Sequence, residues 1–210
     1  MISRVSAWGV ISIVCILSGT AAAGSSDLPG DPSRPAQVFD AFPAIFMENN
    51  GQWDASIRYA FQGKGINVLF SDEGPEFQLF GANDKGKASR AVFGARFIGS
   101  NSTRAEGTDI SPAKVNFYKG KDLSGWKTGI RTYRKVVYRT IYDGVDLYCY
   151  ARRDGLKYEF HCAPGADWGK IAITFEGAKG LRVDQRGALH IETGLGEIVD
   201  EAPVVYQIKG

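Results

Sequence analysis

The sequence has little histidine, cysteine or methionine, and this scarcity limits the chemistry that it can support. Its 210 residues include 2 histidines, 3 cysteines and 2 methionines. A Ser/His/Asp site needs a histidine beside a nucleophile and an acid, but His161 and His190 lie in strand-like patterns and no G-x-S-x-G elbow occurs. A zinc site of Cys149, His161 and Cys162 is disfavoured because adjacent strand residues point to opposite faces. We therefore expect a protein without catalytic activity, metal or cofactor.

No apolar run is long enough to span a membrane, and the run near the N-terminus predicts export. The run over residues 5–17 is shorter than the roughly 20 apolar residues that span a membrane. It follows Arg4 and leads into the small residues Ala21 to Ala23, which is the order of a secretory signal peptide cut before Gly24. We expect residues 1–23 to be removed, leaving no membrane anchor and a secreted or cell-surface protein, with the periplasm as an alternative.

Sustained helical periods are absent from the rest of the chain, which predicts an all-β fold. Residues 24–38 are rich in Gly, Ser, Pro and Asp and indicate a flexible leader. Residues 39–210 carry short runs of alternating, aromatic or β-branched residues, separated by turn residues, as in antiparallel sandwiches. The best helical alternative, residues 127–142, is crowded with Thr, Val, Ile and Tyr, which favour a strand. We predict an antiparallel β-sandwich-like domain over residues 39–210.

The stretch ARRDGLKYEF predicts a hairpin, and its charges suggest a register. A two-residue turn that begins one residue before Gly155 would place Arg152 opposite Lys157, and like charges destabilise a sheet. A turn that begins at Gly155 places Arg152 opposite Glu159 instead. We therefore predict the second register.

The same register sets two cysteines opposite each other. Cys149 faces Cys162 at a non-hydrogen-bonded position, where the Cα atoms of two strands are closest. In an oxidising compartment this pairing predicts a disulfide between Cys149 and Cys162. Two buried free thiols are the alternative, because a slip of register would separate them.

A basic and aromatic band is the best candidate for binding. Between residues 114 and 157 there are 11 Lys and Arg against four Asp, interleaved with tyrosines. Arg and aromatic side chains on one sheet face predict a site for acidic glycans, and with a net charge of only +2 we expect no nucleic-acid partner. The structural alternative is that tyrosines pack inward while Arg and Lys face solvent and prevent edge-to-edge aggregation. The predicted ligand-binding residues are Trp126, Arg131, Tyr133, Arg134 and Arg139.

Two carboxylate pairs have weaker claims to chemistry. Glu48 and Asp54, in the stretch MENNGQWD, could form a glycosidase-like acid/base pair, but the Asn-Asn-Gly run favours a turn with Trp53 in the core. Asp143 and Asp146 could bind calcium, but two side chains are too few for a site, and Asp-Gly is typical of a turn.

Three blocks carry a resemblance to a known family. They are ENNGQWDASIRY, the long block VNFYKGKDLSGWKTGIRTYRKVVYRTIYDGVDLYCYARRDGLKYEFHCAPGADWGKIAITFEGA, and GALHIETGLGEIVDEAPVVYQ. In order and spacing they resemble a domain of unknown function at the N-terminus of secreted bacterial proteins with SBBP repeats, which are short β-propeller-related repeats. The resemblance covers about residues 43–208.

The resemblance implies an exported bacterial protein and a β-rich module that precedes repeats, with no catalytic residues. The sequence departs from the pattern by ending at YQIKG, where members run on through more strands, which indicates a truncated product or a fragment. It also has Cys149 and Cys162 where the family usually has aliphatic or aromatic residues, so the disulfide would be a local addition.

The predicted function is a non-catalytic extracellular module that caps or presents downstream β repeats. An array of β repeats has an unpaired edge that a flanking β domain can cover. The expected partners are those repeats or other surface proteins. The first alternative is a carbohydrate-binding module that uses the basic, aromatic band. A hydrolase that uses Glu48 and Asp54 is the second.

Overall fold

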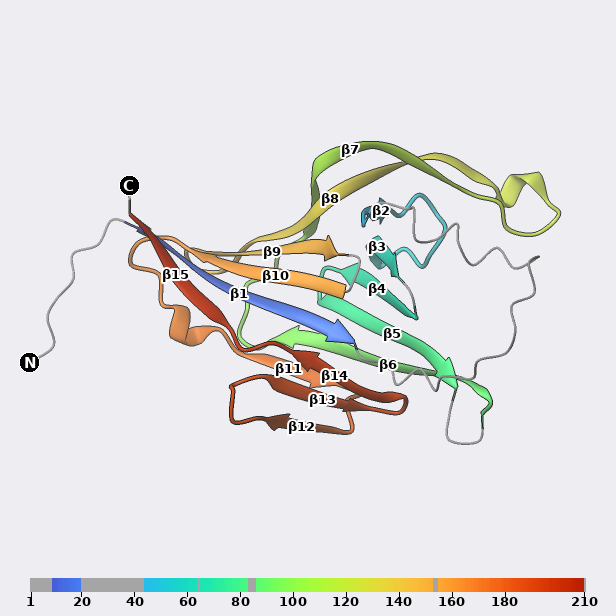
Figure 1. Cartoon of the computed structure of the whole chain (residues 1–210). Coiled ribbons are helices and arrows are strands. Elements are labelled where there is room, and N and C mark those ends of the chain that lie inside the picture. The colour runs from blue at the N-terminus through green and yellow to red at the C-terminus, as the bar shows by residue number, and fades with distance from the viewer. Residues whose placement is uncertain (1–8, 20–43, 64, 83–85, 153–154, 210) are drawn as a thin grey trace, which may run out of the picture.

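The computed structural model describes residues 9–19, 44–63, 65–82, 86–152 and 155–209, and these form the antiparallel all-β fold that the alternation predicts (Figure 1). The strands are β1 (Gly9–Gly19), β2 (Phe46–Glu48), β3 (Ile57–Gly63), β4 (Ile66–Ser71), β5 (Gly74–Ala82), β6 (Ala88–Phe97), β7 (Ala105–Phe117), β8 (Lys127–Tyr142), β9 (Val145–Arg152), β10 (Gly155–Cys162), β11 (Ile173–Glu176), β12 (Gly180–Val183), β13 (Leu189–Thr193), β14 (Gly196–Asp200) and β15 (Val204–Lys209). Short 3-10 turns lie at Leu123–Gly125 and Trp168–Lys170.

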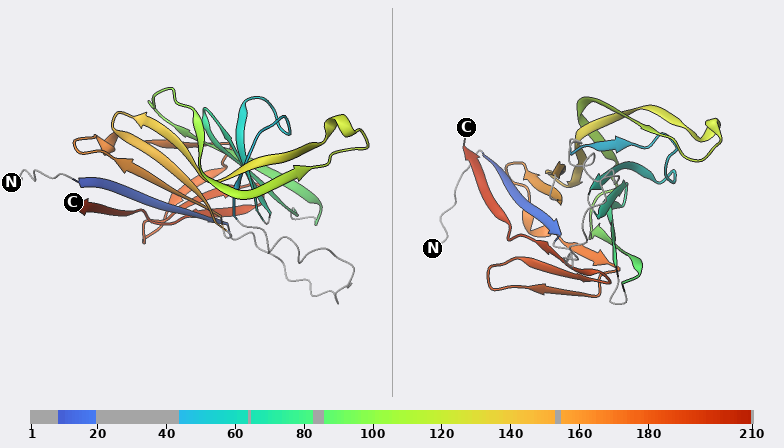
Figure 2. Two further views of the ribbon diagram at one scale, coloured as in Figure 1. Left: turned by 90° about the horizontal axis from the view of Figure 1, so that it is seen from above. Right: turned by 45° about the vertical axis from the view of Figure 1, so that its right-hand side comes forward.

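The strands form one strongly curled sheet with a smaller sheet attached. The order is β11-β6-β5-β4-β3-β2-β8-β9-β10-β1-β14-β13-β12, while β7 pairs with β8 and β15 pairs with β1. The strands from β11 to β10 curve into a half-barrel, and β12 to β14 make the smaller sheet (Figure 2). The only sheet pairing between these two parts, within the described residues, runs through β1.

The core lies between the two arms of the half-barrel, because alternate residues of each strand point inward. Phe97 of β6 meets Phe160 of β10 edge-on at 6.1 Å between ring centroids, and Phe77 stacks on Phe93 at 4.8 Å. All these rings except Phe97 are almost fully buried, and each fully buried Phe contributes about 1.5–3 kcal/mol of transfer free energy. The facing arms give the sandwich-like packing expected from the sequence.

Residues 127–142 form a strand rather than a helix, as predicted from their β-branched composition. In β8 they pair with β7, β2 and β9, and β7–β8 makes the long hairpin that projects from the half-barrel in Figure 1. The hairpin ends in the 3-10 turn Leu123–Gly125, whose first residues are held by Asp122 accepting from the Ser124 N–H at 2.9 Å.

A β-bulge interrupts the pairing of β8 with β9, and it accounts for two acidic residues. Thr140 has a φ of 49°, an uncommon value for a β-branched residue. The Thr140 N–H donates to Asp146 Oδ1 at 2.7 Å, and Asn101 donates to Asp143 Oδ1 at 3.1 Å. Asp146 therefore holds the bulge backbone, while Asp143 binds the Asn101 side chain at the predicted turn, and the two carboxylates do not share a ligand position.

The β9–β10 hairpin forms as predicted, but its predicted register is wrong. Gly155 lies opposite Arg152, and Glu159 lies opposite Tyr148 rather than Arg152. The cross-strand charge argument fails because Glu159 is satisfied along its own strand, by Lys157 at 2.6 Å and His161 at 2.8 Å. The two registers differ by four residues and leave the same side chains on the inner face, and in the observed one Gly155 pairs with Arg152 instead of lying in the turn.

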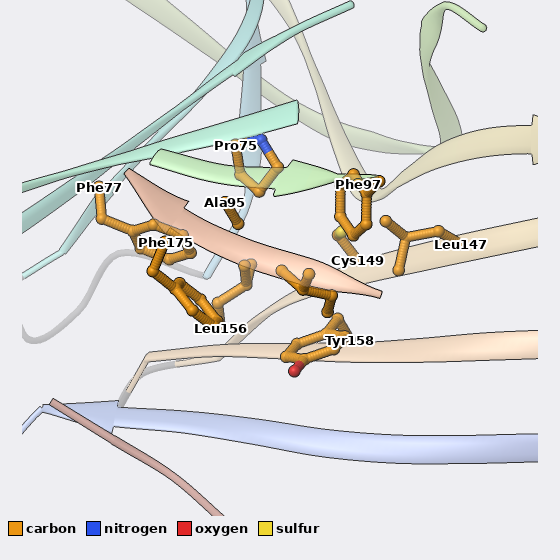
Figure 3. Close-up of a pocket in the computed structure, with 10 residues that line it drawn as sticks. Pro75, Phe77, Ala95, Phe97, Leu147, Cys149, Leu156, Tyr158 and Phe175 are labelled. Atoms are coloured by element: carbon orange, nitrogen blue, oxygen red, sulfur yellow. The ribbon is translucent and has the colours of Figure 1, made fainter. Parts of the chain in front are cut away.

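The predicted disulfide is wrong because the predicted register of the hairpin is wrong. Cys149 lies opposite Tyr158, and Cys162 lies opposite Val145. Four residues of strand separate the two positions, or about 13 Å, whereas a disulfide needs Cα atoms within about 7 Å. Both thiols are free and buried, and Figure 3 shows Cys149 among apolar core side chains. Burial raises the pKa of both thiols.

Strand β1 consists of residues from the predicted signal peptide. The rest of that peptide, the predicted leader over residues 24–38 and the first residues of the predicted domain lie outside the described residues. The backbone of β1 pairs antiparallel with β10 on one edge and with β14 and β15 on the other. Across the described ranges, no helix has the length and apolar character needed to cross a membrane.

Candidate functional site

The five predicted ligand-binding residues do not form one site. They are spread along β8 and the turn before it, and Trp126 and Arg139 are separated by 13 residues of largely extended chain, or about 43 Å. Trp126 lies near the hairpin tip against Tyr118, at 4.8 Å between ring centroids, whereas Arg139 lies at the bulge. Two of the five contact residues that line a polar cleft: Arg131 binds Glu48, and Tyr133 packs on Tyr59.

Each predicted arginine is already paired with a carboxylate. The pairs are Arg131–Glu48 at 2.7 Å, Arg134–Asp109 at 3.0 Å and Arg139–Glu106 at 3.4 Å. Exposed pairs of this kind contribute about 0–1 kcal/mol each to stability. They also neutralise the positive charge that the sequence places on β8, so the surface offers no continuous basic band along these arginines.

The stretch MENNGQWD forms the end of β2 and a loop organised by one side chain. Asn49 donates through Nδ2 to the carbonyls of Asp54 and Ile57, both at 2.8 Å, and accepts through Oδ1 from Gly51 N–H at 3.0 Å. Gly51 has a φ of 93°, a left-handed conformation that favours glycine. Trp53 is half-buried rather than central to the core, and it packs on Phe117.

Glu48 and Asp54 do not have the environment of an acid/base pair. Arg131 binds both oxygens of Glu48, at 2.7 and 2.8 Å, while Asp54 Oδ1 accepts from Ser56 N–H and Oγ. The hydrogen bonds from Ser56 lower the pKa of Asp54, whereas a general acid at neutral pH needs a raised pKa. This geometry accords with the turn interpretation.

A polar cleft of about 310 Å³ lies beside this loop. Tyr59 forms part of its lining and meets Tyr133 edge-on at 5.5 Å, so two aromatic rings pack at its base. Gly107 of β7 lets these rings pack closely, because a Cβ there would lie 2.7 Å from Tyr59 and 2.8 Å from Tyr133. The lining side chains that can bind polar groups are Glu48, Asn49, Trp53, Arg58, Tyr59 and Arg104.

One cation of the cleft, Arg104, has little compensating negative charge. Arg58 is bound to Asp72 at 2.7 Å, and that hydrogen bond lowers the pKa of Asp72. Arg104 also lowers the pKa of Asp72 through its charge, but within the described residues no hydrogen bond or ion pair holds its exposed guanidinium. Arg104 can therefore meet an anionic ligand without first losing a partner.

Sequence reasoning missed most of this cleft. Arg58, Tyr59 and Arg104 lie outside the basic band, in β3 and in the segment before β7. Nothing in their local pattern distinguishes them from other strand-end residues. They come together because β2, β3 and β7 all lie near the middle of β8.

The two histidines are engaged by carboxylates. His161 binds Glu159 at 2.8 Å and stacks on Tyr148. It lies on the face opposite the buried Cys162, and strand alternation predicts this arrangement. His190 binds Glu197 through Nδ1 at 2.7 Å and Asp184 through Nε2 at 3.3 Å. These contacts with carboxylates, Glu197 first, raise the pKa of His190 and favour a cation over a general base. Among the residues described, no group of three or more His, Cys, Asp or Glu could hold a metal ion.

A second cavity lies inside the core and holds about 20 Å³, close to the space of one water molecule (Figure 3). Its lining is almost entirely apolar, with Phe97, Leu147, Leu156 and Phe175 around it. A cavity of this size and character stays dry and is a packing defect rather than a binding site.

Comparison with known proteins identifies a family. The family model described as a domain of unknown function (DUF7948) matches residues 46–210, from the first residue of β2 to the last residue of the chain. No curated protein and no solved structure matches the chain.

Proposed function

We propose, from the premise that this chain belongs to the family of domains of unknown function DUF7948, that it is a non-catalytic structural module of an exported bacterial protein. In this role it covers the edge of downstream β repeats of the SBBP type, or binds another surface protein. The family supplies no activity, and the proposal depends on the distribution of exposed apolar residues.

The observation that carries the proposal is the apolar surface of two strands at the C-terminal end of the domain. On β12, Val183 is 66% exposed, and on β15, Val204 and Val205 are 61% and 60% exposed. β12 ends the sheet order, and β15 pairs with β1 alone among the described strands. Soluble domains usually protect such edges with charge or cover them with a neighbour. A β repeat that follows β15 would supply that cover.

The charged groups support a structural role. Glu48, Asp146 and Glu159 each accept hydrogen bonds from neighbouring residues, and both histidines bind carboxylates. Groups held in this way stabilise strand pairing and turns. Glu48, Asp146 and the two histidines are among the few candidates that the sequence offered for acid, base or metal-ligand roles.

The test joins the chain to three SBBP-type repeats after Gly210 and measures thermal unfolding of each part and of the fusion. We expect one cooperative transition above that of either part alone. The variant Val183→Lys/Val205→Lys should separate it into two transitions, because lysine on both edges prevents close packing. Ile110→Lys on β7, at a residue that is 66% exposed, is the matched control and should leave the single transition unchanged. Two independent transitions in the unaltered fusion would contradict the proposal.

The polar cleft supports a second candidate function, the binding of acidic glycans. Arg104 and the rings of Trp53 and Tyr59 offer charge and stacking surface within one hollow. Arg131, the only arginine of the predicted set near it, contributes through Glu48 rather than as an unpaired cation. Arg134 and Arg139 pair with other carboxylates along β8 and lie outside the cleft lining.

A sulfated or uronic-acid oligosaccharide panel tests this candidate. Arg104→Ala should weaken binding by about tenfold or more, since one charge-assisted hydrogen bond contributes roughly 1.5–3 kcal/mol. Arg186→Ala, which removes an exposed arginine elsewhere, is the control for general charge and should change binding little. Equal losses in both variants would show non-specific attraction and would reject the cleft as a site.

A further inference from the structure

Strand β1 occupies a position with backbone partners on both edges. Residues Ile11 to Ser18 lie opposite Cys162 to Gly155 of β10. On the other edge, Gly9 to Val14 lie opposite β15, and Leu17 to Gly19 lie opposite β14. A strand in this position is therefore an interior strand of the sheet, and its loss would leave two unpaired edges facing each other.

The edge of β10 defines the chemistry of the strand that pairs with it. Leu156, Tyr158, Phe160 and Cys162 form an almost fully buried row. Residues directly opposite each other in a sheet share one face, so the positions facing this row must be apolar. In residues 9–19 those positions are held by Leu17, Cys15, Ile13 and Ile11, and the whole strand is uncharged.

One oxygen of a buried carboxylate beside β1 lacks a hydrogen-bond donor. Asp200 of β14 is only 5% exposed, and its Oδ2 accepts from the Tyr158 hydroxyl at 2.6 Å. Its Oδ1 has no hydrogen-bond partner among the described residues. A buried, unpaired acceptor of this kind destabilises the fold. Asp200 lies opposite position 17 of β1, which is a leucine and has no side-chain donor.

We propose that the position of β1 is a strand-acceptor site: after export removes residues 1–23, an uncharged apolar β-strand of another polypeptide inserts antiparallel to β10. Strand addition of this kind obtains affinity from main-chain hydrogen bonds and specificity from alternate side chains. The inference rests on the proposed interaction role and names the surface and the chemistry of the partner.

The chain's own β15 is poorly suited to fill the gap. β15 and β10 are both antiparallel to β1, so β15 would have to pair parallel to β10. It has 6 residues against the 8 of β10, and it follows β14 after only Glu201–Pro203. An incoming strand that runs like β1 instead pairs antiparallel with β10, β14 and β15 together.

The first step of the test establishes which chain is present. The protein is expressed from Met1 in an export-competent bacterium, and the exported form is identified by intact mass. We expect an N-terminus at Gly24. Hydrogen exchange should show fast-exchanging alternate amides in Gly155–Cys162 of this form. The full chain, made without export, should protect those amides.

The second step adds a guest strand, the sequence of residues 9–19 fused to a soluble carrier with Ser in place of Cys15. It should protect the β10 and β15 amides of the exported form and bind the unexported full chain weakly. Val14→Pro in the guest is the matched control, and should bind about tenfold more weakly or worse because proline removes a ladder donor.

Several results would overturn the inference. These are an exported chain that retains residues 9–19, β10 amides already protected in the processed monomer, a dimer formed by exchange of β15, or a proline guest that binds as well as its parent. The inference and the proposed function can fail separately. Coupling to repeats is measured through Val183 and Val205, and strand insertion through the β10 amides.

Discussion

Gly107 shows how one residue determines the shape of the cleft. The rings of Tyr59 and Tyr133 leave no room for a Cβ at this position. Gly107→Ala should therefore lower the free energy of unfolding by about 1–3 kcal/mol, the usual cost of overpacking, and should weaken any ligand of the cleft. Urea denaturation measures the change. Gly81→Ala, whose Cβ would make only an ordinary 3.7 Å contact, should stay within about 0.5 kcal/mol of the parent.

Thr140 carries backbone strain that a substitution can relieve. At a φ of 49° a β-branched residue is strained, whereas asparagine tolerates this conformation. Because the bulge is held by the Thr140 N–H and carbonyl, Thr140→Asn keeps both hydrogen bonds. We expect a gain of about 0.5–1 kcal/mol in the free energy of unfolding by urea denaturation. Thr128→Asn, an exposed β8 residue without positive φ, should give no gain, and equal gains would contradict the strain argument.

At the scale of elements, the β9–β10 hairpin separates what local pattern determines from what packing determines. The alternation predicts both strands and their inner faces, but it does not distinguish the predicted register from the observed one, because the two differ by four residues and leave the same side chains facing inward. In the observed register Cys149 lies opposite Tyr158, and Gly155 pairs with Arg152 instead of lying in the turn. Charges at the hairpin find partners along one strand, so they do not determine the register.

The register has a direct chemical consequence for the thiols. Peptide mapping after alkylation in denaturant without reductant should find Cys149 and Cys162 both labelled. In the native protein, labelling should be slow, because burial raises the pKa of both thiols and limits access. A Cys149–Cys162 disulfide peptide, or a mass two hydrogens lower, would contradict this register.

At the scale of the whole molecule, Tyr158 and Asp200 connect the half-barrel to the smaller sheet beside β1. Burial raises the pKa of Asp200 from 3.8 to about 6. The neutral carboxyl is therefore the form that the fold favours. Its contribution to stability is complete below about pH 4 and is lost as pH rises through 6, a change of about 3 kcal/mol.

Asp200→Asn in the full chain should remove this slope, since asparagine does not titrate and can still accept from Tyr158. The free energy of unfolding in urea, measured from pH 4 to pH 7.5, should fall with pH in the parent more steeply than in the variant. Glu73→Gln, which changes an exposed carboxyl, should keep the parental slope. Parallel curves for Asp200→Asn and the parent would show that Asp200 is not buried in solution.

The sequence by itself determined the strands of this protein, because period-two alternation and β-branched composition are properties of neighbouring residues. Residues 127–142 could be assigned to a strand for that reason, and His161 and Cys162 to opposite faces. Part of the site could also be predicted from the sequence, since Arg131 and Tyr133 both contact the Glu48 region. The tertiary structure alone decided the hairpin register, the separation of the thiols, the pairing of each arginine, and the approach of Arg104 to Tyr59. These depend on residues far apart in the chain, whose contacts are selected by burial and close packing of the whole sheet.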